Sequence, residues 1–109
     1  MPKGELRRHT RVPASHKLVV SWVDGQGLQK VVRALCVDIS ESGMRVESTV
    51  PIEAGSAITF RDDQLVLSGS GSVRYCFRRE MKYQVGVEFN IRLGLQLQVY
   101  LCLRQAGPA

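Results

Sequence analysis

Long apolar runs are absent from this 109-residue chain. No stretch reaches the roughly 18 apolar residues that a membrane-spanning helix needs, and no charged start leads into an apolar segment with a cleavage site. We therefore expect neither membrane insertion nor secretion, and a cytoplasmic location. Hydrophobic residues still make up 44% of the chain, which suits a single folded domain with a modest core.

Cysteine and histidine are scarce. Cys36, Cys76 and Cys102 lie far apart among apolar neighbours, which favours reduced, buried thiols over a disulfide or a metal site. His9 and His16 have no serine, cysteine or carboxylate at a spacing typical of a catalytic triad. With no catalytic set and no metal-ligand pair, the sequence predicts a protein that is not an enzyme and has no cofactor or metal.

Basic charge is concentrated at the N-terminus. The first 17 residues hold five basic side chains against one acidic side chain, Glu5, and so carry +4 of the net charge of +5. Pro2, Gly4 and Pro13 interrupt residues 1–16, which show no clean periodicity and are predicted to form a flexible arm. A basic arm on a nearly neutral body indicates an anionic partner.

Alternating apolar and polar residues predict six short β-strands. These strands cover residues 17–23, 28–39, a segment starting at Gly43, 57–60, 65–77 and 83–89. Asp24–Gly27 predicts a hairpin turn, Arg61–Gln64 a second turn, and the Gly/Ser run Ser68–Ser72 a bulge or sharp bend in the fifth strand. The pattern is typical of a small antiparallel barrel or sandwich, with residues 17–109 as its body.

Residues 91–104 carry two conflicting signals. Apolar residues recur at every second position, as in a strand, while the Leu, Gln and Arg content favours a helix. We predict a C-terminal α-helix, with Asn90 as its N-cap.

The stretch Asp38–Gly43 combines a carboxylate, a hydroxyl and a glycine in one short turn. Asp38 could accept hydrogen bonds from a purine edge, Ser40 could donate one to a phosphate, and Gly43 would let a ligand approach the backbone. The same pattern is equally typical of an ordinary Asx or Ser/Thr turn, so by itself it does not establish a ligand site.

A second motif lies in the arm, where Arg7 and Arg11 are four residues apart. A guanidinium presents a rigid fork of donors that matches phosphate oxygens or the O6/N7 edge of guanine, and its flat face can stack on a base. Taken alone, such a cluster is more typical of a solvated run of charges.

Together the two motifs resemble the signature of the PilZ domain family. Arg-x-x-x-Arg at 7–11 is followed, after 26 residues, by Asp-x-Ser-x-x-Gly at 38–43. Val73–Tyr75 and Tyr83–Phe89 are similar to later strands of that family. The resemblance implies a six-stranded antiparallel β-barrel followed by a helix, and a bacterial receptor for the second messenger cyclic di-GMP rather than an enzyme.

The resemblance also implies residue roles. Arg7 and Arg11 would clamp guanine and phosphate, while Asp38, Ser40 and Gly43 would form the opposite wall, with Asp38 on a guanine edge and Ser40 near phosphate. Further contacts are implied less directly: Arg74 as a phosphate or stacking partner, Arg8 with Arg74 as support for an intercalated pair of ligands, and Leu6 as a residue that favours a single ligand. The ligand stoichiometry stays open.

Two other functions fit the sequence less well. One is a PilZ-like protein-interaction module that binds no nucleotide, which the intact motifs disfavour. The other is an oligonucleotide binder, which the 6% aromatic content and its separation from the basic residues disfavour, so no nucleic-acid partner is expected. A receptor of this size needs a downstream protein partner, which the sequence does not identify, and the domain could be a monomer or a homodimer.

Overall fold

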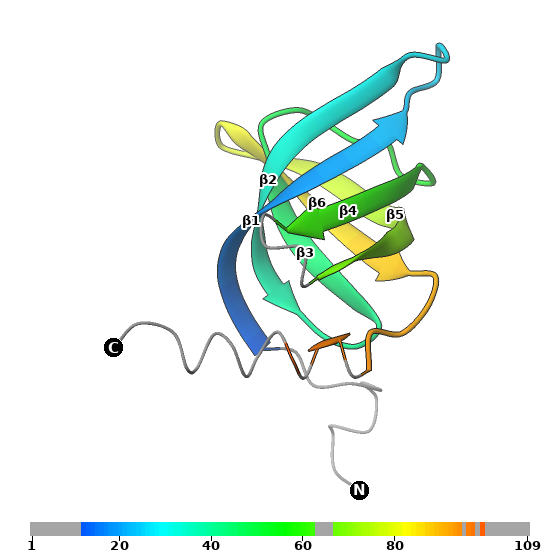
Figure 1. The fold of residues 1–109 in the computed structure, drawn as a ribbon. Helices are drawn as coiled ribbons and strands as arrows, with labels where there is room; N and C mark the ends of the chain where they lie inside the picture. Colours follow the sequence, from blue (N-terminus) through cyan, green and yellow to red (C-terminus); the bar gives the residue numbers. More distant parts are fainter. Residues whose placement is uncertain (1–11, 63–66, 95, 98, 100–109) are drawn as a thin grey trace, which may run out of the picture.

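The computed structural model describes residues 12–62, 67–94, 96, 97 and 99, and these form a closed six-stranded antiparallel barrel (Figure 1). Its strands are β1 (Val12–Val23), β2 (Gln29–Ile39), β3 (Gly43–Ser48), β4 (Ala57–Asp62), β5 (Ser68–Arg79) and β6 (Lys82–Phe89). They follow one another around the barrel as β1-β2-β3-β6-β5-β4, and β4 pairs with β1 to close it. The barrel alternative is therefore confirmed over the sandwich.

The predicted alternation of side chains builds the core. In β1 the inward residues Leu18, Val20 and Trp22 are buried, and in β3 Met44 and Val46 are buried while Arg45 and Glu47 are less so. The core on the other strands includes a stacked pair of rings, Phe60 on β4 and Phe89 on β6, with centroids 5.2 Å apart. Period-2 patterning thus specified which face of each strand turns inward.

The turn predicted at Asp24–Gly27 is confirmed. The Gly27 N–H donates to the Asp24 carbonyl oxygen, and Gly27 has a φ of 84°, which favours glycine. The carboxylate of Asp24 accepts the N–H groups of Gln26 and Leu28, each at 2.9 Å. The Leu28 hydrogen bond is the main cause that lowers the pKa of Asp24 below its ordinary value.

The first strand begins earlier than predicted. It starts at Val12 instead of residue 17, so residues 12–16, which the sequence assigns to the flexible arm, belong to β1, and Val12, Pro13 and His16 pair with β2. Val12 faces Ile39 and Pro13 faces Asp38, and the strand register shifts between Pro13 and His16. Because Pro-Ala-Ser shows no alternation of apolar and polar residues, the sequence pattern does not predict a strand here. The point where the N-terminal segment joins the barrel therefore lies beside Asp38.

Of the bulge or sharp bend predicted within Ser68–Ser72, the bulge is wrong, and the sharp bend stays a prediction. These residues pair without interruption with β4, and the irregularity of β5 falls later, between Val73 and Tyr75. The glycines serve close packing instead: a Cβ on Gly71 would lie 2.4 Å from the carbonyl oxygen of Glu88. At the preceding turn, β4 extends through Arg61 and Asp62, and residues 63–66 lie outside the described part of the chain.

The segment after β6 covers one end of the barrel. Leu93 and Leu97 belong to the core, and the Leu93 N–H donates to the carbonyl oxygen of Glu41 at 3.0 Å. Residues 96, 97 and 99 have helical backbone, but residues 91–94 do not, so the predicted helix start at residue 91, with Asn90 as its N-cap, is wrong. The other half of residues 91–104 lies outside the described part of the chain, as does Cys102. The amide of Asn90 donates to Ser70 Oγ at 3.0 Å, which ties it to β5.

Of the other two cysteines, Cys36 is buried and Cys76 is partly buried. Within the described ranges, no helix is long and apolar enough to cross a membrane.

Candidate functional site

Ser40 organises the turn between β2 and β3. Its N–H donates to the Gly43 carbonyl at 2.8 Å, and its hydroxyl oxygen accepts the N–H groups of Ser42 and Gly43, each at 3.2 Å. Ser40 is only 2% exposed. The hydroxyl that the sequence predicts to meet a phosphate is thus engaged inside the turn, and its observed contacts are those of a Ser/Thr turn.

Gly43 allows β3 to approach β6. A Cβ at this position would lie 2.4 Å from the Val87 carbonyl oxygen, closer than real Cβ contacts come. A side chain here would push the two strands apart. Gly43 therefore has a packing role that is independent of any ligand.

Asp38 is held by an arginine that sequence reasoning missed. Arg45 lies opposite Asp38 in the β2–β3 register, and its Nε and Nη2 contact Asp38 Oδ2 at 2.7 and 2.5 Å. The hydrogen bond to Asp38 is the main cause that raises the pKa of the Arg45 guanidinium. The alternation in β3 predicts that the Arg45 side chain points outward, but only the strand register identifies its partner.

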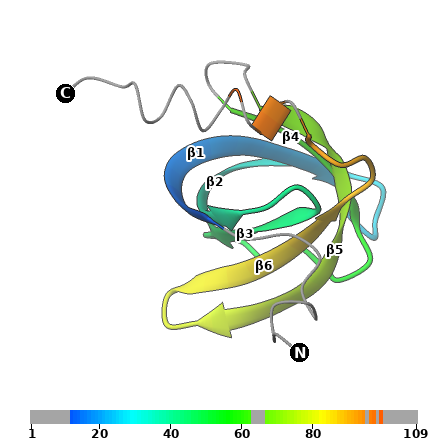
Figure 2. The ribbon, with the colours of Figure 1, turned by 90° about the horizontal axis from the view of Figure 1, so that it is seen from below.

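A hollow of about 180 Å³ lies next to this turn, across β3, β6 and β5. It brings together Gly43 and Arg74, two predicted site residues that are 31 positions apart in the sequence. Figure 2 shows these three strands side by side. The other residues around the hollow are Ser42, Tyr75, Gly86, Val87 and Glu88.

Arg74 forms an ion pair on the rim of this hollow. Its Nη1 lies 2.6 Å from Glu88 Oε1, and both side chains are more than half exposed. Exposed pairs of this kind contribute little to stability, so the guanidinium can exchange Glu88 for another anion at low cost. Arg74 is thus an accessible cation within reach of the turn.

The predicted clamp, Arg7 and Arg11, lies outside the described residues, as do Leu6 and Arg8. Their attachment to the barrel is described, because Val12 begins β1 and Pro13 faces Asp38. The structure therefore brings Asp38, Ser40, Gly43 and Arg74 to one side of the barrel and leaves the positions of the arm residues as a prediction.

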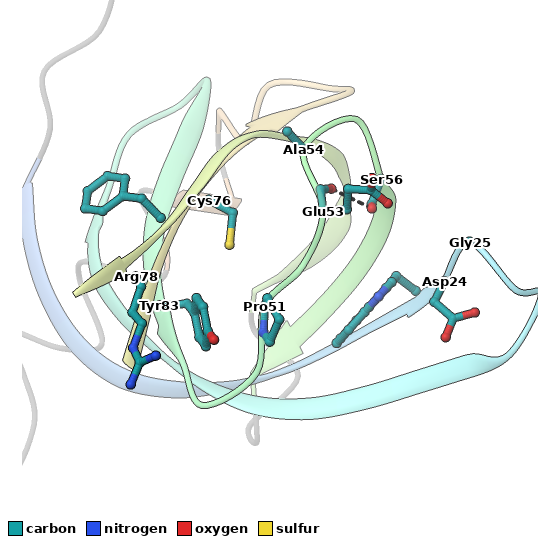
Figure 3. Close-up of a pocket in the computed structure, with 11 residues that line it drawn as sticks. Asp24, Gly25, Pro51, Glu53, Ala54, Ser56, Cys76, Arg78 and Tyr83 are labelled. Atoms are coloured by element: carbon teal, nitrogen blue, oxygen red, sulfur yellow. Dashed lines mark hydrogen bonds between the residues drawn. The ribbon is translucent and has the colours of Figure 1, made fainter. Parts of the chain in front are cut away.

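A larger hollow, of about 410 Å³, opens at the other end of the barrel, where Cys76, Tyr83 and Pro51 surround it (Figure 3). Of the predicted ligand-binding residues, the four that the structure describes, Asp38, Ser40, Gly43 and Arg74, do not line it. Over the described ranges, no three His, Cys, Asp or Glu side chains gather as a metal site would require.

Known structures share this fold. The chain resembles the Bacillus subtilis inhibitor of motility MotI (DgrA) with a TM-score of 0.66 and 18% identity, covering 92% of this chain and 51% of that one. It resembles Escherichia coli YcgR in complex with c-di-GMP (TM-score 0.61, 16% identity, 92% and 47% covered). The Klebsiella pneumoniae MrkH–c-di-GMP complex gives a TM-score of 0.63 at 16% identity, with 92% and 52% covered.

This chain thus spans about half the length of these three proteins. No curated protein is similar enough in sequence to match it. A family model matches residues 5–102, a range that includes both arginines of the arm, the Asp38–Gly43 turn and all six strands. On that match, this chain belongs to the PilZ domain family.

Proposed function

We propose that this chain is a receptor domain that binds cyclic di-GMP between its N-terminal arm and the Asp38–Gly43 turn. One observation carries the proposal: Pro13 faces Asp38 in the β1–β2 register, so the segment that bears Arg11 and Arg7 enters the barrel at the turn itself. YcgR and MrkH, which share the fold, have been solved with c-di-GMP. That agreement supports the choice of ligand.

The chemistry of the site suits an anionic guanine dinucleotide. Arg7 and Arg11 supply the forks for guanine and phosphate, and Arg74 supplies an exposed cation on the opposite rim. Asp38 can accept hydrogen bonds from a guanine edge while it keeps Arg45, because each carboxylate oxygen accepts more than one hydrogen bond. Ser40 stabilises the Asp38–Gly43 turn, because its hydroxyl oxygen accepts the N–H groups of Ser42 and Gly43. To bind a phosphate, the hydroxyl would have to give up one of these hydrogen bonds.

Ligand binding would order the arm across the barrel. Each charge-assisted hydrogen bond contributes about 1.5–3 kcal/mol before the entropic cost of ordering the segment is subtracted. Two arginines on a ligand with two phosphates can therefore offset that cost. The closed arm would then present a new surface to a downstream protein or to another domain, which is how we propose that the signal is passed on.

Calorimetric titration with cyclic di-GMP tests this proposal. Arg7→Ala and Arg11→Ala should each weaken binding by at least about tenfold. Arg61→Ala is the matched control, since Arg61 is an exposed arginine on β4 and lines none of the hollow beside Asp38. Unchanged affinity in both arm variants would show that the arm is not the clamp.

Titrations with GTP and with a short single-stranded oligonucleotide, repeated over a range of salt concentrations, separate the alternatives. A receptor prefers the cyclic dinucleotide. An oligonucleotide binder would show no such preference and a steep salt dependence. An absence of binding to all three would favour a nucleotide-free interaction module.

A further inference from the structure

The irregularity in β5 turns two neighbouring side chains to the same side of the strand. Ser72 faces Glu88 and Val73 faces Val87, but the next pair is Tyr75 with Gly86, so Arg74 is the extra residue of a bulge. Val73 points inward and is 2% exposed, whereas Arg74 and Tyr75 are both exposed. Bulges occur often beside functional sites because they redirect side chains in this way. Here the bulge brings a cation and an aromatic ring to the hollow together.

The ring of Tyr75 lies flat on Gly86 of the neighbouring strand. A Cβ on Gly86 would be 2.2 Å from Cε2 and 2.4 and 2.7 Å from the two ring carbons bonded to it, Cζ and Cδ2. Such similar distances require the Cβ position to lie above the face of the ring, not beyond its edge. One face of Tyr75 therefore covers Gly86 and the opposite face points away from Gly86, while the ring also stacks with Phe77 at a centroid distance of 5.8 Å.

Arg45 lies on the other side of Gly86 from Tyr75. It faces Gly86 in the β3–β6 register, and the Tyr75 side chain contributes, after Asp38, to the raised pKa of its guanidinium. The row Asp38, Arg45, Gly86 and Tyr75 thus runs across four adjacent strands. It connects the carboxylate proposed to read guanine with an aromatic ring.

We infer that Tyr75, with Arg45 beside it, is a base-stacking platform for a purine of the bound cyclic dinucleotide. The inference rests on the proposed function and adds a specific ligand contact to it. Aromatic rings and arginine planes are the groups on which bases stack, and Tyr75 lines the hollow and is 38% exposed. The ring can lie on the sheet because residue 86 is a glycine: any side chain there would push the Tyr75 ring away from β6.

An ordinary structural role for Tyr75 is to cover an otherwise bare glycine in a strand. Covering the glycine requires an apolar side chain, which leucine also provides. It does not require an aromatic face. A series at this one position therefore separates the two roles: Tyr75→Phe keeps the ring, Tyr75→Leu keeps only the cover, and Tyr75→Trp enlarges the ring.

Calorimetry with cyclic di-GMP should give wild-type affinity within about threefold for Tyr75→Phe and a loss of about tenfold for Tyr75→Leu. In Tyr75→Trp, the exposed indole should be quenched when cyclic di-GMP is added, while the emission of the buried Trp22 stays unchanged. This second measurement does not depend on whether the leucine variant folds.

Three outcomes would overturn the platform: Tyr75→Leu binding as tightly as wild type, Tyr75→Phe losing as much affinity as Tyr75→Leu, or no quenching of the introduced indole in Tyr75→Trp at saturating ligand. In each of these cases wild-type binding would still support the receptor itself. If the wild-type protein failed to bind cyclic di-GMP, the proposed function would fail and the platform with it.

Discussion

Two hollows of different size and character lie near opposite ends of the barrel, the larger at one end and the smaller on the wall beside the Asp38–Gly43 turn. The larger, about 410 Å³, is walled by Trp22, Pro51 and Tyr83, and the smaller, about 180 Å³, is bordered by Arg74 and the Asp38–Gly43 turn. Volume alone would favour the larger hollow as a ligand site. The smaller one borders the residues that we propose to bind an anionic guanine dinucleotide, so the candidate site in this protein is chosen by its chemistry and not by its size.

The largest expected effect separates the two ends directly. The double variant Arg7→Ala/Arg11→Ala should lose about 100-fold or more in affinity for cyclic di-GMP, because two charge-assisted contacts are removed at once. Arg78→Ala, at the rim of the larger hollow, should change the affinity less than about twofold. Calorimetry measures both. If Arg78→Ala lost more affinity than the double arm variant, the ligand site would have to be assigned to the larger hollow.

Gly43→Ala should destabilise the barrel by about 1–3 kcal/mol, since its Cβ would overlap the backbone of β6. Gly25→Ala, in the turn at the other end, is the matched control, because no atom lies within 4 Å of its Cβ position. That variant should change stability by no more than about 0.5 kcal/mol. Urea unfolding gives both values, and equal effects would refute the close strand approach at Gly43.

Asp38→Ala should weaken the binding of cyclic di-GMP by about tenfold through the loss of guanine recognition. A cyclic dinucleotide without guanine should lose much less, which a parallel titration checks. Equal losses for the two ligands would mean that Asp38 acts by holding Arg45 and the turn, not by contacting a base.

Arg45→Lys keeps the charge near Asp38 but removes the two-pronged contact from Nε and Nη2. The expected cost in stability is about 1 kcal/mol, measured by urea unfolding. In an Asp38→Asn background the same substitution should cost clearly less. An equal cost in both backgrounds would show that Arg45 stabilises the barrel through other contacts.

The smallest effect concerns Asp24, at the end away from the candidate site. Its pKa is lowered from 3.8, chiefly by the Leu28 N–H, so its charged form favours the folded state. This contribution is present above the unfolded-state pKa and is lost as the pH falls through the lower folded-state pKa. Asp24→Asn should therefore lower Tm slightly at pH 7 and less near pH 3. The same Tm difference at both pH values would contradict this assignment.

Much of the fold follows from local patterns. The alternation in β1, β3 and β6 predicted both the strands and their inward faces, and Asp24–Gly27 predicted its turn. The errors share one cause: a local pattern does not reveal what a residue meets across the sheet. Gly71 resembled a bulge residue but serves close packing against β6, and Pro13 resembled part of a loop but pairs with β2.

By itself the sequence determined the six strands, the two motifs and their chemistry, because these depend on residue type and short-range spacing. Only the tertiary structure decided that Arg45 holds Asp38, that Gly43 and Arg74 share a hollow, and that Tyr75 lies flat on Gly86. Each of these contacts joins different strands. Their positions depend on strand register and on a one-residue bulge, which are set by packing around the closed barrel and not by any single segment.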